Sequence, residues 1–395
     1  MHSRGVSSRA ARVALVAVVL GGALLSSVAH SEAESAATHF TFEKKGVLIP
    51  SPEGVPAPGP YYPVLVKMDG VADFPYDYAL YFSTDHHNGD GGIWLYLCNG
   101  APSEPENWIA YEAAVARGDF DYLEKKPSGN PIYKDTTQGR QTETPCVNII
   151  DGTVFMTYHN AGAGHNQSTL LATSPDGLNF TRIHGEKNSI VLDYDAKNEV
   201  GDGHTGYFRW RPNVFPGVGY AYSGFALHGG GDDFHGSMWA SKDAVHWTRF
   251  QIFDSIEGHA VEAPNIVRRR SIDPNSITPL GNGEFVALCA LGNRASGTTP
   301  RRLQLYEVFL GSDGRELTRQ CRKVLGNGPE GAPDFEELGQ PTTAVIDGVW
   351  HLIYVGARND SSVNTLMSAV GRLNLDAPKS VPLAPEERRR DLRGE

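Results

Sequence analysis

Three carboxyl groups of the sequence stand close to prolines, in contexts typical of the ends of short strands. Glu143 precedes Thr144-Pro145, Asp273 directly precedes Pro274, and Glu262 lies within the segment VEAPNIV. Carboxyl groups that face one another can divide a reaction between them, because one donates a proton while the other activates a nucleophile. These three residues are therefore the candidates for acid, base and tuning carboxylate, without assignment among them.

A second set of polar residues is rich in histidine and arginine. Histidine titrates near neutral pH, and the planar arginine fork matches a carboxylate, a phosphate or a vicinal diol. Arg209 and Arg211 alternate within HTGYFRWRP, so they should share one strand face. Two alternatives stay open: an ion pair that joins neighbouring sheets, and polar side chains that only satisfy loop backbone. The candidate binding residues are Tyr62, Asp85, His86, His87, His159, Arg209, Arg211, His228, Arg294 and Arg358.

A repeated pattern predicts the elements that position these residues. Each copy has a residue followed by proline, a short apolar segment, a glycine turn and a second apolar segment. Proline is tolerated at the first position of a strand, and Asp-Gly or Asn-Gly turns close hairpins. TSPDGLNFTR, ASKDAVHWTRF and GSDGRELTR then resemble turns between a third and a fourth strand. The five prolines are Pro63, Pro145, Pro212, Pro274 and Pro341.

Five copies of four strands predict an all-β fold, a five-bladed β-propeller of four-stranded antiparallel blades over residues 38–376. A pair of β-sandwiches is the alternative, and it gives no reason for the repeated proline. Residues 38–50 should supply the outer strand that closes the ring. Residues 101–141 form an insertion with a helix in PENWIAYEAAVARGDF, and residues 377–395 read as a flexible charged tail.

Propeller geometry predicts that one face collects the candidate residues. The start of each innermost strand and the end of the next strand open on the same side, so the polar residues should surround one mouth. Tyr61, Tyr207, Trp210 and Gln340 fall near this mouth as well, and aromatic rings there are suited to stacking on sugars. The convergence of several strands on one concavity favours a functional site.

The N-terminal pattern predicts a signal peptide over residues 1–29, because three arginines precede an apolar run and a small-residue cleavage site. We therefore expect a secreted or periplasmic protein that has no membrane segment after the signal is removed. The net charge of −11 becomes −14 once the three arginines of residues 1–29 are lost. Such an acidic surface argues against nucleic acid as a partner.

The four cysteines permit disulfides in an exported chain, and three pairings are open. Cys98 and Cys146 are one plausible pair. No spacing indicates a cysteine zinc site, and the sequence requires no cofactor. A structural divalent cation in the central channel is compatible with the sequence but not established by it.

The X-Pro strand starts, the second strands YALYFSTD and VFMTYHN and the turn SPDGLNF resemble the five-bladed β-propeller carbohydrate-active enzymes, such as glycoside hydrolase family 43 and its relatives. The resemblance covers residues 40–375 and implies a glycan-degrading hydrolase with its site in the central funnel. In that family an aspartate-proline opens the first blade, but Tyr62-Pro63 stands there in this chain.

This departure leaves two alternatives open beside hydrolysis of a polysaccharide or oligosaccharide. A polysaccharide lyase acting on a uronic-acid glycan would use tyrosine, histidine and arginine in place of a carboxylate base. A non-catalytic glycan-binding propeller would need aromatic platforms and no proton donor. The sequence alone does not choose the sugar or the linkage.

Overall fold

The computed structural model divides the chain into two units, residues 1–36 and residues 37–395. All described residues belong to the second unit, and the predicted signal peptide and most of the predicted tail lie outside them. No helix in the described part of the chain is long and apolar enough to span a membrane. The structure describes residues 37–51, 59–84, 91–135, 141–161, 167–183, 189–193, 204–229, 235–253, 266–293, 302–315, 319, 321–357 and 364–378.

Antiparallel sheets build the second unit. Three separate sheets follow one another along the chain, in the orders β2-β3-β4-β5, β10-β8-β7-β6 and β11-β12-β13-β14, and β9 also pairs with β8. Their bounds are β2 (Tyr61–Lys67), β3 (Tyr78–Ser83), β4 (Ile93–Cys98), β5 (Trp108–Ala110), β6 (Glu143–Ile150), β7 (Thr153–Ala161), β8 (Gln167–Ser174), β9 (Thr181–Arg182), β10 (Ile190–Leu192), β11 (His204–Pro212), β12 (Tyr222–Gly229), β13 (His235–Ser241) and β14 (Trp247–Phe253).

The rest of the chain forms a nine-stranded sheet in which two antiparallel groups meet. β15, β16, β17, β18 and β19 form one group and β20, β21, β22 and β1 the other, and the parallel pairing of Leu303 with Glu337 joins them. The bounds are β1 (Phe40–Ile49), β15 (Ile266–Ile272), β16 (Thr278–Gly281), β17 (Glu284–Asn293), β18 (Arg302–Leu310), β19 (Arg322–Leu325), β20 (Glu337–Ile346), β21 (Val349–Ala357) and β22 (Thr365–Leu373).

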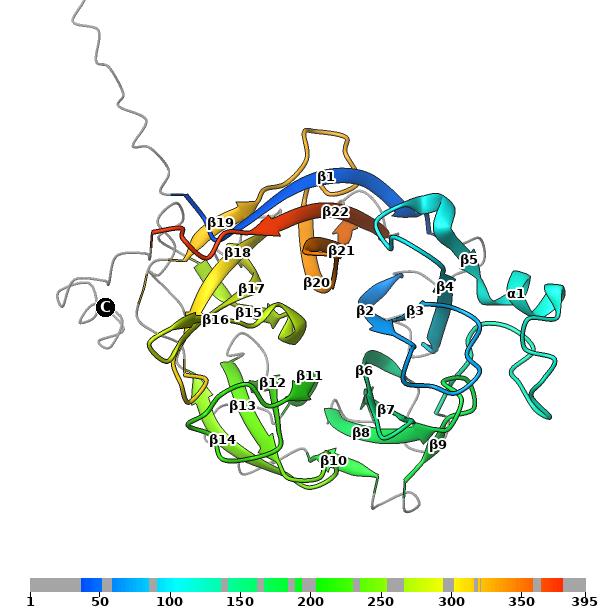
Figure 1. Ribbon diagram of the computed structural model, residues 1–395. Coiled ribbons are helices and arrows are strands. Elements are labelled where there is room, and N and C mark those ends of the chain that lie inside the picture. The colour runs from blue at the N-terminus through cyan, green and yellow to red at the C-terminus, as the bar shows by residue number, and fades with distance from the viewer. Residues whose placement is uncertain are drawn as a thin grey trace, which may run out of the picture. The chain divides into compact units, whose positions relative to one another are not determined.

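The sheets of this unit surround a common centre, with β2, β6, β11, β15 and β20 innermost (Figure 1). A buried apolar cluster lies between each sheet and its neighbour. The largest one combines residues of the first two sheets, such as Tyr81, Leu95, Met156 and Tyr158. Burial of apolar area between sheets therefore supplies the main stabilisation of this arrangement.

Short helices occur between the strands. The expected helix within residues 105–120 is confirmed as α1 (Tyr111–Arg117), preceded by the 3₁₀ helix η1 (Pro105–Asn107). Gly118 ends α1 in the left-handed conformation, at φ 83°. A second 3₁₀ helix, η2 (Pro274–Ser276), follows β15.

Four innermost strands share one distortion near their starts. Tyr62, Thr144, Tyr207 and Gln340 have φ between 47° and 54°, and the pairing register shifts at each of them. A β-bulge of this kind re-aims side chains at the end of a strand. In three strands the next residue is Pro63, Pro145 or Pro341, which explains the proline signal of the sequence. In β11 the next residue is Phe208.

The proline pattern was therefore wrong for two of its five copies. Pro212 ends β11, so Arg209 and Arg211 lie in the second half of that strand and not at its start. Pro274 opens η2 after β15, and Asp273 caps that turn by accepting a hydrogen bond from the Asn275 amide at 3.1 Å. Proline thus marks helix starts as well as strand starts.

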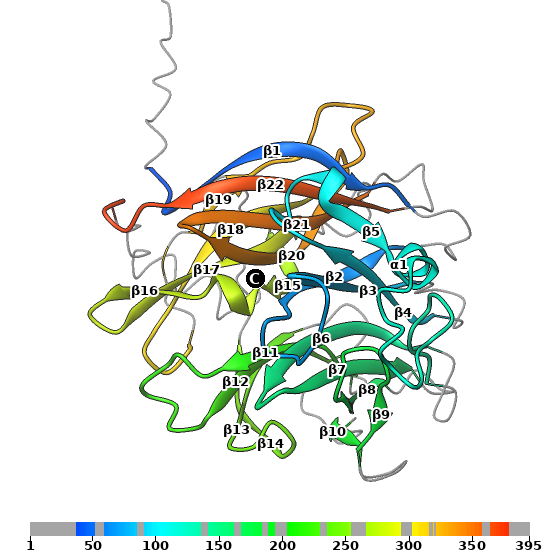
Figure 2. The same ribbon diagram turned by 45° about the vertical axis from the view of Figure 1, so that its right-hand side comes forward.

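The chain closes through its first and last strands, as predicted for residues 38–50. β1 pairs with β22 from Phe40 opposite Leu373 to Ile49 opposite Leu366, along the outside of the sheet (Figures 1 and 2). The predicted pairing of Cys98 with Cys146 is wrong. Cys98 and Cys146 are free, buried thiols that lie in different apolar clusters.

A buried charge network fixes both ends of the described chain. The Arg322 guanidinium donates to the Ala37 carbonyl at 2.7 Å, to the Pro378 carbonyl at 2.8 Å and to the Glu307 carboxylate at 2.5 Å. Glu307 also accepts the His39 amide at 2.7 Å. Arg322 therefore ties the segment before β1 and the segment after β22 to the strands β18 and β19.

We expect Arg322→Met to destabilise the fold by about 3–5 kcal/mol, because it leaves the carboxylate of Glu307 buried without its cation. The matched control is Arg315→Met, which removes an exposed pair with Asp313 and should cost about 0–1 kcal/mol. Urea unfolding followed by tryptophan fluorescence measures both free energies of unfolding. Equal midpoints for the two variants would contradict the role given to Arg322.

Candidate functional site

We call five side chains the mouth: Tyr62, Glu143, Tyr207 and Gln340, which lie near the starts of innermost strands, and His159 of β7. Glu143 begins β6 and stands opposite His159 of β7 in the register. The two side chains are buried, and His159 Nε2 lies 3.7 Å from Glu143 Oε1. The predicted meeting of strand starts with second-strand ends is thus confirmed for this sheet. A carboxylate and an imidazole at this separation form a pair that can hold and pass a proton.

Aromatic rings cover this pair. The Tyr207 ring meets His159 edge-on, with centroids 5.1 Å apart, and lies 4.8 Å from the Tyr62 ring. The Tyr62 amide donates to Gln340 Oε1 at 2.6 Å, which links β2 to β20. Tyr62 and Tyr207 are both half-buried. Aromatic rings are suited to packing against the C–H face of a sugar ring.

The Arg209 guanidinium lies directly below the mouth, and we call this layer the floor. The Arg209 side chain is buried, and its guanidinium donates to the carbonyls of Pro63, at 3.0 Å, and Pro341. These carbonyls belong to the residues directly after Tyr62 and Gln340, and the guanidinium lies 5.9 Å from the centroid of the Tyr62 ring. Burial lowers the pKa of Arg209. One side chain of β11 therefore crosses the centre to reach both β2 and β20.

Asp273 lies below this floor. Its Oδ2 accepts a hydrogen bond from the Thr343 hydroxyl at 2.5 Å. Thr343 stands three residues after Gln340 on β20, which corresponds to roughly 7–10 Å along a strand. Burial raises the pKa of Asp273 to about 6, opposed by the Thr343 hydrogen bond and by the charges of Arg209 and Arg211. Asp273 is therefore the buried counter-ion of two arginines.

Arg211 completes this lower cluster. It donates to the Pro274 carbonyl at 2.7 Å, and its pKa is lowered by burial. Both arginines act on Asp273, which fits the prediction that they share a strand face. Within the described part of the chain the Arg211 Nε has no hydrogen-bond partner.

The structure thus separates the predicted site residues into three groups. Tyr62, Glu143 and His159 meet at the mouth, whereas Arg209, Arg211 and Asp273 lie in and below the floor. The strand position of His228 is known, opposite Thr205, but its side chain lies outside the described residues. Those wholly outside the described residues are Asp85, His86, His87, Glu262, Arg294 and Arg358.

The sequence placed Tyr207 and Gln340 near the mouth but did not include them among the candidate binding residues, although both occupy the bulge position of their strands. Gln340 directly precedes Pro341, so the repeated proline pattern could have identified it. Tyr207 has no such mark, because Phe208 follows it. Among the described residues, no group of three or more His, Cys, Asp or Glu side chains is arranged to hold a metal ion.

No family model matches the chain, and no curated protein matches its sequence. Similar solved structures include an N-acetylgalactosamine deacetylase from F. plautii in complex with blood group B trisaccharide. That structure has 12% sequence identity to this chain and a TM-score of 0.58, and the match covers 85% of this chain and 96% of that one.

Two further structures are similar over much of their length. A β-1,2-mannobiose phosphorylase from Listeria innocua has 9% identity and a TM-score of 0.53, with coverage of 84% of this chain and 96% of that chain. An α-L-arabinofuranosidase from Podospora anserina, in complex with cellotriose, has 9% identity and a TM-score of 0.50, with coverage of 85% and 98%.

These likenesses confirm the predicted resemblance in fold to the five-bladed β-propeller carbohydrate-active enzymes. The described part of this chain is nearly all β, with four-stranded antiparallel sheets and the arrangement of a β-propeller. At these identities the likeness concerns the fold, and the chemistry has to be argued from the mouth itself.

The raised pKa of Asp273 predicts a pH dependence of stability. The folded chain holds this proton up to about pH 6, whereas the unfolded chain releases it near its ordinary value of 3.8. Folding therefore binds a proton in this window, and stability falls as the pH rises from about 4 to about 6.

Asp273→Asn removes this titration. Relative to wild type, the variant should gain about 2–3 kcal/mol between pH 4 and pH 7, since one pKa unit corresponds to about 1.4 kcal/mol. Urea unfolding at pH 4, 5, 6 and 7 measures the difference between the two proteins. A difference that stays constant over this range would contradict the proposed protonation of Asp273.

Proposed function

We propose that this chain is a five-bladed β-propeller enzyme that acts on glycans at the mouth, most directly as a glycoside hydrolase. The blade count follows if the nine-stranded sheet is divided at its parallel pairing of Leu303 with Glu337. Each of the five innermost strands, β2, β6, β11, β15 and β20, then belongs to one antiparallel blade. A register shift near the start of all five strands supports this equivalence.

One observation carries the functional proposal: a buried glutamate–histidine pair contacts Tyr207, which packs against Tyr62, and both tyrosines are half-buried. Cleavage of a glycosidic bond needs a proton on the leaving oxygen. Glu143 is the group we propose as donor, and His159 at 3.7 Å exchanges the proton with it between turnovers. Tyr62 and Tyr207 would hold the sugar ring over the pair.

The glycan as substrate class is supported by the neighbouring structures. Those proteins are in complex with a blood group B trisaccharide, β-1,2-mannobiose and cellotriose, respectively. The bond that is broken differs among them, since one is a deacetylase, one a phosphorylase and one a glycosidase. Our proposal for this chain is hydrolysis, and the other two bond types become outcomes of the test.

A hydrolase also needs a group that activates water on the opposite face of the sugar. Asp273 is a weak candidate for this role, because the guanidinium of Arg209 lies between it and the mouth. Glu262, outside the described residues, stays the candidate for the second carboxylate. We assign Asp273 instead to positioning: its charge holds Arg209, which holds the strands that carry Tyr62 and Gln340.

A second candidate function is supported by the contact of Tyr207 with His159. A polysaccharide lyase removes the proton at C5 of a uronic acid with a tyrosine or histidine and neutralises the substrate carboxylate with a cation. The Tyr207–His159 contact, with ring centroids 5.1 Å apart, supports this alternative because either residue type can remove that proton. This reading makes the Tyr207 hydroxyl essential, whereas hydrolysis requires only its ring.

The activity test uses purified protein and a panel of neutral, uronic-acid and N-acetylated glycans, with and without phosphate. Reducing ends without new near-ultraviolet absorbance indicate hydrolysis. Reducing ends together with that absorbance indicate a lyase, whereas released acetate indicates deacetylation. Cleavage that depends on phosphate indicates a phosphorylase. Binding without any product would leave a glycan-binding propeller and contradict the proposed activity.

We expect Glu143→Gln to lower kcat by about 10²–10⁴-fold, since this is the usual contribution of one proton-transferring group. The matched control is Glu106→Gln, which changes an exposed glutamate and should leave kcat unchanged. A Glu143→Gln variant with the kcat of wild type would exclude Glu143 as the proton donor.

Tyr207→Phe separates the two candidate reactions. Hydrolysis should keep kcat within about tenfold of wild type, because the ring remains in place against the sugar. Lyase chemistry should lose about 10²-fold or more, because the hydroxyl that transfers the proton is gone. The rate on the substrate found in the panel measures this difference.

Export of the protein is proposed from residues 1–29 alone. We infer that the signal is removed after Ala29 and that residues 38–376 form the mature catalytic domain, located outside the cytoplasm. N-terminal sequencing of the exported protein tests this cleavage position directly.

A further inference from the structure

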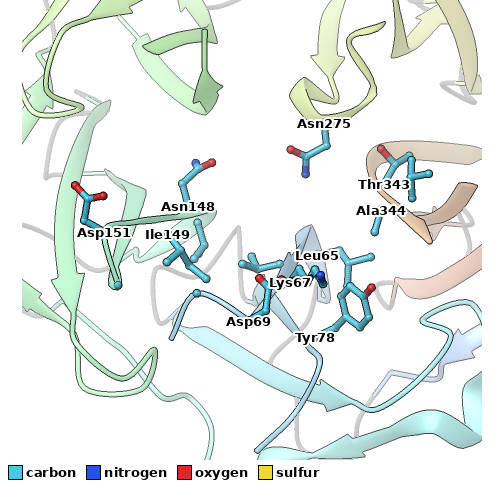
Figure 3. A pocket seen from close by; sticks show the side chains of 15 residues that line it. Leu65, Lys67, Asp69, Tyr78, Asn148, Ile149, Asp151, Asn275, Thr343 and Ala344 are labelled. Carbon is cyan, nitrogen blue, oxygen red and sulfur yellow. Dashed lines mark ion pairs between the residues drawn. The ribbon is translucent and has the colours of Figure 1, made fainter. Parts of the chain in front are cut away.

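A pocket of 540 Å³ lies at the other end of the innermost strands (Figure 3). This volume falls within the range of roughly 300–1,000 Å³ that is typical of small-molecule sites. The last residues of β2, β6 and β20 line it, together with Asn275 of η2 and the turns after β2 and β6. We call it the lower pocket.

The lower pocket is separate from the mouth. Two of its lining residues, Asn275 and Thr343, hold Asp273 from below through the hydrogen bonds already described. Above Asp273 the guanidinium of Arg209 spans from Pro63 to Pro341. A ligand in the lower pocket would therefore contact neither Glu143 nor Tyr207.

The lining combines polar groups with an aliphatic wall. Asn275 is exposed and presents a side-chain amide, while Asn148 uses its Nδ2 to donate to the Trp210 carbonyl at 3.0 Å and keeps its Oδ1 available. Figure 3 shows these two amides on opposite sides of the pocket, with Ile149 and Ala344 close to them. Val345 is 51% exposed and adds an accessible aliphatic group to the lining.

The charges of the lower pocket disfavour an anionic ligand. Asp69 and Asp151 supply two carboxylates against one ammonium, that of Lys67. Lys67 is already paired, with its Nζ 2.6 Å from Asp69 Oδ2, and this partner raises its pKa. A uronic acid would thus meet a surplus of negative charge, whereas uncharged hydroxyls could both donate to the carboxylates and accept from the amides.

We propose that the lower pocket is a second binding site for a neutral oligosaccharide, separate from the catalytic mouth. Hydroxyls would bond to Asn275, Asn148 and Asp151, and a sugar C–H face would pack on the wall that includes Val345. The choice of a glycan as ligand class rests on the proposed function; the position of the site and its preference for an uncharged ligand do not. Such a site would hold one segment of a long glycan while another is processed.

The test measures binding by isothermal titration calorimetry in the Glu143→Gln background, which limits consumption of the ligand. The probes are cellotriose and xylotriose as neutral sugars and trigalacturonate as the anionic control. Asn275→Ala combined with Val345→Asp removes an amide and places a charge on the aliphatic wall. The matched control is Val349→Asp, which charges a valine that is 37% exposed on β21 and outside the pocket lining.

We expect the double variant to weaken the binding of a neutral trisaccharide to one site at least tenfold, and Val349→Asp to leave it unchanged. Tyr207→Ala should leave this site intact, because Tyr207 belongs to the mouth. Asn275→Ala alone should weaken the same site in part, and it serves as the second variant if the double variant melts at a lower temperature.

Equal affinity of the double variant and Val349→Asp would overturn the inference. No binding of either neutral probe, or tighter pocket binding of trigalacturonate, would do the same. Loss of pocket binding in the double variant supports the inference even if the activity panel gives no product, an outcome that contradicts only the proposed function. If the activity panel gives a product but neither neutral probe binds the lower pocket while its lining is intact, the result contradicts only the inference.

Discussion

The arrangement at the centre of this protein depends on one buried guanidinium. Arg209 starts on β11 and bonds to backbone carbonyls of β2 and β20, so that a single side chain connects three blades. A buried cation requires compensation, and Asp273 supplies it from below together with two carbonyl oxygens. Arg209 and Asp273 lie between the mouth residues and the lower pocket, because Asn275 and Thr343 of the pocket lining bond to Asp273.

The division explains why candidate carboxylates have such different surroundings. Glu143 is buried beside His159, and the Tyr207 ring packs edge-on against that histidine. Asp273 is enclosed, hydrogen-bonded and paired with arginine, which favours a supporting role over contact with a substrate. We therefore propose proton transfer for the Glu143–His159 pair and a positioning role for Asp273 and its two arginines.

Much of this architecture could be predicted from the sequence, because the signals are local. The turns at Asp151-Gly152 and Asp347-Gly348 adopt the positive φ angles that tight hairpins need, and the pairing of Glu143 with His159 follows from the hairpin that joins β6 to β7. The closing strand β1 was predicted from the segment left over before the first repeat.

The features that could not be predicted from the sequence depend on contacts between distant residues. Pro212 and Pro274 look like the other prolines, but they stand after their strands, and only the bulge at Tyr207 reveals the true register of β11. The reach of Arg209 to Pro63 and Pro341 spans more than a hundred residues of sequence and leaves no local pattern. The lower pocket is equally non-local, since three blades and η2 build it.

The most direct test of the central claim is a crystal structure of the Glu143→Gln variant soaked with the oligosaccharide that the wild type binds best. The account predicts a sugar ring against Tyr62 and Tyr207, with a glycosidic oxygen within hydrogen-bond distance of the side chain at position 143. An empty mouth, with sugar bound only elsewhere on the molecule, would contradict it.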